Sequence, residues 1–167
     1  ATNALGAVWV VGGDPTVENL AKRRGASWRP EEGTNVNQSL EVAFQAIKQT
    51  GQAALYLPSD LPFLQRRDLE DLIAATSRMK NVVLAPAHRD GGTNAILLPR
   101  DSEFRLFLGP GSFRRHLAQA ACPGLDMSIC YSQGLALDLD TWEDVQAYKA
   151  LEPGLLERLT KGNVSDV

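Results

Sequence analysis

Residues 40–62 read LEVAFQAIKQTGQAALYLPSDLP and contain two different hydrophobic patterns in close succession. In the first half, four apolar residues are spaced i, i+3, i+4 and i+7, which places them on one face of an amphipathic helix: Leu40, Ala43, Phe44 and Ile47. Gly51 is the expected end of this helix. The continuous apolar run 53–57 is typical of a strand buried on both faces of a sheet, and Pro58 ends it. The stretch therefore predicts a helix followed by a central strand.

The same alternation of helices and strands extends in both directions along the chain. Buried strands are predicted at 7–11, 53–57, 82–85 and 94–98, and short strands at 127–130 and 135–139. Helices are predicted after Asp14, before Gly51, around Leu72, after Ser112 and, as the last element, after Thr141. In the first of these helices, Val17, Leu20 and Ala21 form the expected buried stripe. We expect one domain over residues 1–167, a three-layer α/β/α fold with a mostly parallel open sheet. In such sheets ligands bind at the carboxyl ends of the strands.

Composition excludes several classes of protein. The 167 residues carry 17 basic and 20 acidic side chains, a net charge of -3, which argues against a nucleic-acid partner. No apolar run approaches the roughly 20 residues that cross a bilayer, and no secretory signal is present, so no membrane association is expected. Cys122 and Cys130 form no metal or disulfide motif, which favours a cytoplasmic location.

Asp60 is the first candidate for chemistry. It follows a predicted buried strand and is flanked by Pro58 and Pro62. A carboxylate presented rigidly at the sheet edge suits Mg²⁺, which prefers oxygen ligands and commonly takes one or two carboxylates together with substrate phosphates. The alternative is that Asp60 only turns the chain before the next helix.

Asp138 and Asp140 are the second candidate. If residues 135–139 form a strand, both carboxylates point to one face, where they repel each other unless a cation lies between them. The alternative is that Asp138 is solvated and Asp140 merely precedes the Thr141 cap.

Two glycine-rich turns, at 91–94 and 109–112, are the third candidate. Their backbone N–H groups could converge on a phosphate or carboxylate, although such residues are also common in ordinary turns. His88 and His116 have no evident nucleophile beside them and are expected to be surface or turn residues.

Five strings, taken in order, resemble a known family: Asn35-Val36-Asn37, Pro58-Ser59-Asp60-Leu61-Pro62, Gly91-Gly92-Thr93-Asn94-Ala95, Phe107-Leu108-Gly109-Pro110-Gly111-Ser112-Phe113 and Asp138-Leu139-Asp140-Thr141. Together they are similar to the 2-phospho-L-lactate guanylyltransferases of coenzyme F-420 biosynthesis and their phosphoenolpyruvate and 3-phosphoglycerate relatives. These belong to the nucleotidyltransferase superfamily with a molybdenum-cofactor guanylyltransferase-like, nucleotide-diphospho-sugar transferase-like fold.

The resemblance implies a reaction in which a small phosphorylated acid attacks the α-phosphorus of GTP and pyrophosphate leaves. The acid would be 2-phospho-L-lactate, phosphoenolpyruvate or 3-phospho-D-glycerate. By the same resemblance, Mg²⁺ would lie on Asp60, Asp138 and Asp140, which would be the catalytic residues. Thr93, Gly109 and Ser112 would hold the acid through backbone groups, Asn37 and Ser59 would bind the nucleotide, and a homodimer is possible.

One feature departs from the family pattern. The chain opens with what corresponds to the second strand, so the first strand and the phosphate-binding loop are expected to be missing from this sequence. Two other readings therefore stay open. The protein could be a different Mg²⁺-dependent nucleotidyltransferase, with a sugar phosphate or a molybdopterin as acceptor. It could instead be a non-catalytic domain that binds the phosphorylated acid.

Overall fold

The computed structural model describes residues 5–123 and 125–161, and its elements alternate along most of the chain. The strands are β1 (Trp9–Val11), β2 (Ser27–Arg29), β3 (Ala54–Tyr56), β4 (Val82–Pro86), β5 (Thr93–Leu98) and β6 (Met127–Ile129). The helices are α1 (Pro15–Arg23), α2 (Val36–Gln49), α3 (Arg66–Ala74), α4 (Ser112–Ala118), the 3₁₀ turn η1 (Gln119–Ala121), α5 (Gln133–Ala136), α6 (Trp142–Tyr148) and α7 (Leu155–Lys161). No helix within the described residues has both the length and the apolar character needed to cross a membrane.

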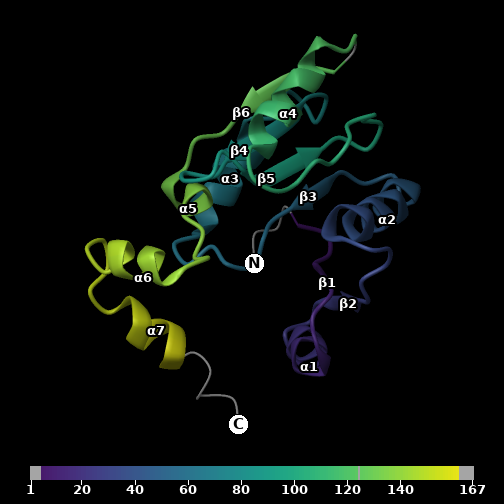
Figure 1. The fold of residues 1–167 in the computed structure, drawn as a ribbon. Helices are drawn as coiled ribbons and strands as arrows, with labels where there is room; N and C mark the ends of the chain where they lie inside the picture. Colours follow the sequence, from purple (N-terminus) through teal and green to yellow (C-terminus); the bar gives the residue numbers. More distant parts are fainter. Residues whose placement is uncertain (1–4, 124, 162–167) are drawn as a thin grey trace.

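The central sheet has four strands in the order β3-β5-β4-β6 (Figure 1). β5 is antiparallel to both of its neighbours, and β4 is parallel to β6, so three of the four strands run in one direction. The mostly parallel sheet predicted from the sequence is confirmed. Because β5 runs against the others, its beginning lies beside the carboxyl ends of β3 and β4.

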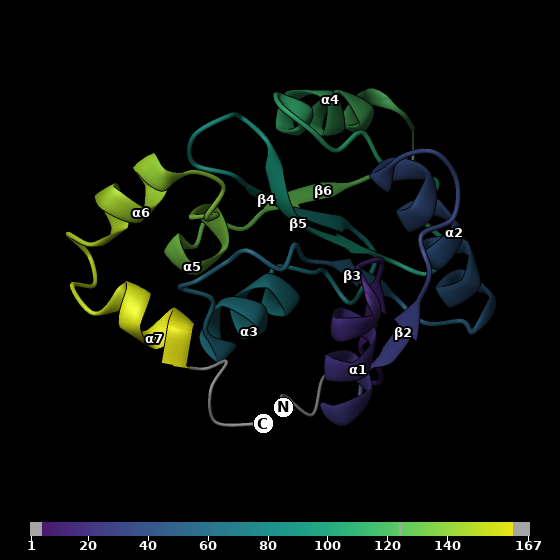
Figure 2. The ribbon, with the colours of Figure 1, turned by 60° about the horizontal axis from the view of Figure 1, so that its bottom comes forward.

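Helices cover both faces of this sheet (Figure 2). On one face, Leu72 of α3 and Leu135 of α5 are fully buried against Val83, Ala95 and Leu97. On the other face, the buried side chains of β4 and β5 pack against partly buried residues of α2 and α4, and the residues involved are Phe44, Val82, Leu84, Ile96, Leu98, Phe113 and Leu117. The alternation of side chains along β5 fills both cores, and the predicted three-layer α/β/α architecture is confirmed.

The amino-terminal strand differs from the prediction. The apolar run 7–11 was expected to be buried on both faces of the sheet. Among the described residues, however, β1 pairs only with β2, in a separate two-stranded parallel sheet, and is half-buried. α1 begins after the Asp14 cap as predicted, yet of its expected stripe only Ala21 is buried, while Val17 and Leu20 are exposed. This part of the chain lies beside the central sheet in Figure 1 and adds no strand to it.

Residues 135–139 also differ from the prediction, because they form no strand. Ser132 caps α5 by accepting a hydrogen bond from the Leu135 amide, and the chain then runs extended through Asp138 to the next helix. The apolar alternation of this stretch reflects the burial of Leu135 and Leu137 in two separate cores. The predicted cap at Thr141 is confirmed as a full capping box with Asp144, but α6 is followed by a further helix, α7.

Candidate active site

Asp60 and the segment 138–140 meet at the carboxyl end of β3. Asp60 lies four residues beyond Tyr56, the last residue of β3, and its carbonyl oxygen accepts a hydrogen bond of 2.9 Å from the Leu139 amide. The Tyr148 hydroxyl of α6 donates to the Asp138 carbonyl oxygen at 2.8 Å and holds the same segment from the other side. Backbone contacts, and not a strand as predicted, therefore bring Asp60, Asp138 and Asp140 into one neighbourhood.

These carboxylates are placed at an electrostatic cost. The pKa of Asp60 is raised, first by burial and then by the charge of Asp140, although a backbone hydrogen bond partly offsets this. The pKa of Asp138 is raised by burial and by Asp140, Asp60 and Asp90. Oδ1 of Asp60 is buried and has no hydrogen-bond partner among the described residues. Buried polar atoms are normally paired, so this carboxylate oxygen is available as a ligand atom for a cation or as an acceptor.

The donor set suits Mg²⁺ in chemistry, although it forms no finished cage. Within residues 5–123 and 125–161 there is no group of three or more His, Cys, Asp or Glu side chains placed to hold a metal ion. Mg²⁺ needs fewer protein ligands than that, because it commonly binds one or two carboxylates and completes its shell with water and phosphate oxygens. Asp60 and Asp138 fit this requirement best. Their role as ligands, and that of Asp140, stays a prediction.

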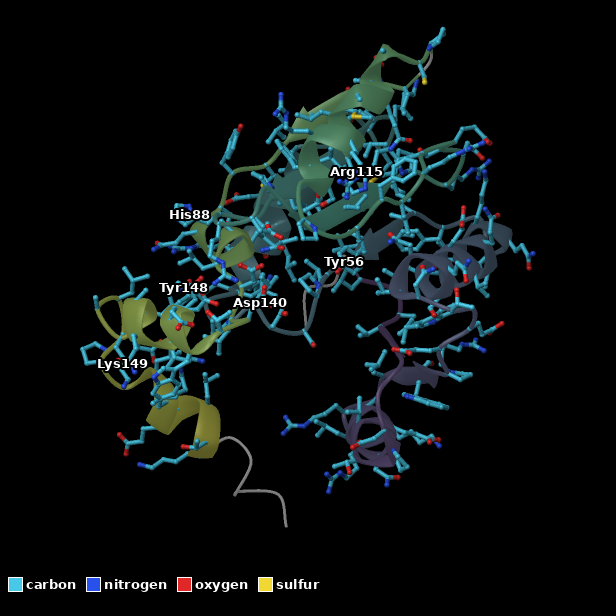
Figure 3. All side chains as sticks on the ribbon, in the orientation of Figure 1. Tyr56, His88, Arg115, Asp140, Tyr148 and Lys149 are labelled. Atoms are coloured by element: carbon cyan, nitrogen blue, oxygen red, sulfur yellow. The ribbon has the colours of Figure 1, made fainter. Side chains whose placement is uncertain are left out.

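Asp140 is engaged by a residue that the sequence analysis did not single out. The Arg89 guanidinium lies 3.5 Å from Asp140 and 2.7 Å from Asp144, and it also donates to the Thr141 hydroxyl. The pKa of Asp144 is lowered despite its burial, because Thr141, the Asp140 amide and Arg89 all stabilise the ionised form. In Figure 3, Asp140 lies between Tyr56 and Tyr148, on the side of α5 and α6. Arg89 is thus a cation at the border of the acidic cluster.

The two glycine-rich turns lie against each other and beside these carboxylates. Gly111 has a φ of 67° and donates its amide to the Asp90 carbonyl oxygen, and a Cβ built on Gly91 would lie 3.6 Å from the Gly111 Cα. The positive φ favours glycine at both positions, with a φ of 68° at Gly91, while the 3.6 Å separation is ordinary van der Waals contact. Because Asp90 also raises the pKa of Asp138, the turns and the carboxylates belong to one end of the sheet.

Two backbone amides at the end of the second turn already have partners within the protein, and the predicted role of this turn toward the acid stays a prediction. The Ser112 amide donates to the Gly109 carbonyl oxygen and the Phe113 amide to the Gly91 carbonyl oxygen, each at 3.0 Å. These amides are therefore not free to bind an anion. The Gly109 amide has no partner among the hydrogen bonds of the described residues, and Gly109 adopts a φ of 119°.

His116 is not a surface or turn residue, as the sequence suggested, but fully buried. Nδ1 of His116 lies 2.8 Å from the Thr93 hydroxyl oxygen, Nε2 accepts from the Phe107 amide at 2.9 Å, and the Ser112 hydroxyl lies 3.1 Å from that of Thr93. Thr93 and Ser112, which were predicted to act together, are thus in contact, through side chains that are themselves buried. His88 is exposed on a turn, as predicted, and its amide donates to the Ala136 carbonyl oxygen.

Residues 105–110 form a segment that we call the paired loop, in which side chains make most of the hydrogen bonds to the backbone N–H and C=O groups. Asn37 of α2 accepts from the Leu108 amide at 2.7 Å and donates to the Leu108 carbonyl oxygen at 3.3 Å. Gln119 makes the same pair of bonds with the Arg105 backbone, and Arg115 donates to the carbonyl oxygens of Phe107 and Pro110. Both polar atoms of the Asn37 amide are therefore engaged, and its predicted contact with a nucleotide stays a prediction.

The remaining predicted residue, Ser59, is exposed beside Asp60, and its role toward the nucleotide also stays a prediction. Sequence reasoning missed a second orphan, Nδ2 of Asn94, which is buried and has no hydrogen-bond partner in the part of the chain that the structure describes. Asn94 lies where the register of β4 and β5 shifts, between the Ala85–Ala95 and Pro86–Thr93 pairs. Such bulges often redirect side chains next to ligand sites. The sequence feature that could have pointed to Asn94 is its position directly after Gly91, Gly92 and Thr93.

The fold and this site define a class. The fold matches a crystal structure from Desulfovibrio desulfuricans G20, of a protein classed among the nucleotide-diphospho-sugar transferases, with a TM-score of 0.65 at 18% identity. The match covers 89% of this chain and 68% of that one. The molecule therefore has the nucleotide-diphospho-sugar transferase fold, with an acidic cluster and two glycine turns at the carboxyl end of its sheet.

The chain belongs to the CofC-like guanylyl transferase family, whose sequence pattern matches residues 1–148. It is 34% identical over 146 residues to the phosphoenolpyruvate guanylyltransferase of Chloroflexus aggregans, which covers 87% of this chain and 72% of that protein. It is 35% identical over 139 residues to the 2-phospho-L-lactate guanylyltransferase of Methanothermobacter thermautotrophicus, covering 83% of this chain and 61% of that protein. The family resemblance inferred from the motifs is confirmed.

Proposed function

We propose that this protein transfers the guanylyl group of GTP to the phosphate of a small phosphorylated carboxylic acid, with Mg²⁺ as cofactor. The observation that carries the proposal is the buried, unpartnered Asp60 carboxylate oxygen, which lies near Asp138 at the end of the sheet. In a member of a guanylyl transferase family, an orphaned oxygen at this place is best explained by a metal ion that accompanies the nucleotide.

The chemistry requires no nucleophile from the protein. A phosphate oxygen of the acid attacks the α-phosphorus of GTP, the bond from that phosphorus to the bridging oxygen breaks, and pyrophosphate leaves with the electron pair. Catalysis of such transfers comes from alignment and charge neutralisation. When bound, Mg²⁺ supplies positive charge that offsets the phosphate oxygens and steadies the leaving pyrophosphate.

The chain's own residues then hold and orient the reactants. Asp60 and Asp138 would hold the metal, with Asp140 beside them. Thr93, Gly109 and Ser112 would hold the acid at the glycine turns, and the free Gly109 amide supports this placement. Asn37 and Ser59 would lie on the nucleotide side.

Two further expectations accompany the proposal. Cys122 and Cys130 are both free thiols, which supports a reducing, cytoplasmic environment. A homodimer is expected from the family resemblance alone, and light scattering at several protein concentrations tests it.

The test is a pyrophosphate-release assay with GTP, Mg²⁺ and one acid at a time: phosphoenolpyruvate, 2-phospho-L-lactate or 3-phospho-D-glycerate. We expect release with at least one acid and none without Mg²⁺, and replacing GTP by ATP checks the base. Binding of an acid without any pyrophosphate release would contradict the proposal and would favour a non-catalytic binding domain.

A further inference from the structure

The buried side chain of His116 has no part in the mechanism above, yet it connects two segments of the acid site. Its ring lies beside Phe104 and Phe107, with centroid distances of 5.2 and 6.3 Å. Burial and the nearby charge of Arg115 lower its pKa to about 4, so the imidazole is neutral at neutral pH. A neutral imidazole has one N–H donor and one acceptor nitrogen.

The hydrogen bonds determine which nitrogen carries the proton. The Phe107 backbone N–H can only donate, so Nε2 of His116 must be the acceptor. The proton therefore lies on Nδ1, which donates to the Thr93 hydroxyl oxygen at 2.8 Å. The Phe107 amide thus sets the tautomer that Thr93 contacts.

The tautomer of His116 determines whether both hydroxyl protons of Thr93 and Ser112 have an acceptor. Thr93 and Ser112 bring two hydroxyl protons, and the 3.1 Å bond between them uses one, whichever hydroxyl donates. His116 cannot accept the other, because Nε2 is occupied and Nδ1 is a donor. Neither hydroxyl has an acceptor besides these among the hydrogen bonds of the described residues. One proton of a pair that is at least nine-tenths buried is therefore without a partner.

We propose that His116 is a positioning residue whose Nδ1–H fixes the Thr93–Ser112 pair so that its spare hydroxyl proton faces an oxygen of the phosphorylated acid. This inference rests on the proposed function, because it assumes that the acid binds at the two glycine turns. A phosphate or carboxylate oxygen accepts such a proton in a charge-assisted hydrogen bond. The same imidazole ties the Phe107 amide to α4, so the tautomer and the position of the paired loop are fixed together.

Two substitutions separate the two bonds of the imidazole. In His116→Asn the amide nitrogen takes the place of Nδ1 and can still donate to Thr93, whereas in His116→Gln the amide oxygen takes the place of Nε2 and can accept only from Phe107. We expect His116→Gln to raise the KM for the acid about tenfold or more with the KM for GTP unchanged, and His116→Asn to stay within about threefold of the wild type. Equal losses in both variants, or a parallel rise in the KM for GTP, would show that His116 only supports the fold.

A double-mutant cycle tests whether His116 acts through Thr93. Thr93→Val keeps the shape and removes the hydroxyl, so it should raise the KM for the acid as His116→Gln does, and the double variant should lose no more than the worse single one. Losses that multiply would overturn the proposal.

Nitrogen NMR of the unliganded chain gives a readout that needs no turnover. The Nδ1 resonance of His116 should be that of a protonated nitrogen and Nε2 that of an acceptor, without titration between pH 6 and 8 because the pKa is about 4. The opposite tautomer would overturn the inference while leaving the proposed function intact. Failure of the wild-type chain to bind any of the acids in calorimetry would instead contradict the proposed function.

Discussion

Two regions of the molecule treat their polar groups in opposite ways. The first, which we call the carboxylate edge, consists of Asp60, Asp138 and Asp140; burial and neighbouring carboxylates raise the pKa values of Asp60 and Asp138, and Oδ1 of Asp60 has no hydrogen-bond partner among the described residues. The second is the paired loop, in which side chains from α2, α4 and η1 hydrogen-bond one backbone group after another. Asp60 at the carboxylate edge has an oxygen without a partner, whereas in the paired loop the backbone groups of Arg105 and Leu108 already have side-chain partners.

The difference indicates what each region contributes to function. Unpaired charges cost stability, so a site built from them depends on a ligand that restores the balance. A loop whose backbone is largely hydrogen-bonded already, with the Gly109 amide left over, costs little further to hold in place, which makes it suitable for orienting a substrate. Under the proposed function, the carboxylate edge would bind the cation and the paired loop would orient the substrate.

The largest expected effect is on turnover at the carboxylate edge. Asp60→Asn should lower kcat by about 10³-fold, because under the proposed function it removes a charge that would hold a metal ion worth several kcal/mol to the transition state. Steady-state pyrophosphate release measures this. Asp101→Asn is the matched control, since Asp101 is exposed and its ion pair is with neighbouring Arg100, and its activity should be unchanged. Full activity in Asp60→Asn would remove Asp60 from the mechanism.

A substitution in the paired loop should cost stability instead. Asn37→Leu leaves the Leu108 amide and carbonyl without their partners, and we expect the free energy of unfolding to fall by roughly 2–3 kcal/mol in urea titrations. Asn19→Leu makes the same change at an exposed position of α1 and should stay within about 0.5 kcal/mol of the wild type. Equal stability of the two variants would contradict the description of the paired loop.

Asn94 should behave like the carboxylate edge and unlike Asn37. Because its buried Nδ2 has no partner, Asn94→Leu should raise the free energy of unfolding by about 1 kcal/mol while slowing turnover. The same urea titrations and pyrophosphate assays decide this. A less stable variant would mean that the Asn94 amide is satisfied in solution.

The smallest effect is expected at Arg89. Its pairs with Asp140 and Asp144 are partly exposed, so Arg89→Gln should lower the free energy of unfolding by less than about 1 kcal/mol. Asp144→Ala should cost more, because Asp144 also completes the capping box of α6. Thermal unfolding of both variants measures these losses of stability, and a larger loss in Arg89→Gln than in Asp144→Ala would contradict the prediction.

Local patterns made much of the fold predictable. The spacing of apolar residues gave α2, continuous apolar runs gave β4 and β5, and the Thr141 cap gave the start of α6. Residues 135–139 were misread because Leu135 and Leu137 alternate like strand residues although each is buried in a different core. Nothing in the run 7–11 distinguishes a central strand from one that pairs only with β2.

The site was predictable where a residue's role follows from its position in the chain. Asp60 could be placed at a strand end because its own neighbours define the strand. The burial of His116 could not be predicted, since it depends on Thr93, 23 residues away, and on the conformation of the paired loop. The contact between Arg89 and Asp144 spans 55 residues and follows only from the fold.

The most direct measurement is thermal unfolding of the wild-type chain and of Asp60→Asn across pH, with and without Mg²⁺ and GTP. The raised pKa of Asp60 means that the folded state holds its proton more tightly, so without ligands the wild type should lose stability relative to the variant as pH rises from below 3.8 through the raised pKa. At neutral pH the unliganded variant should therefore unfold at the same or a higher temperature, and Mg²⁺ with GTP should stabilise the wild type much more. The account would be contradicted if Asp60→Asn unfolded at a lower temperature than the wild type without ligands and if Mg²⁺ with GTP stabilised both proteins equally.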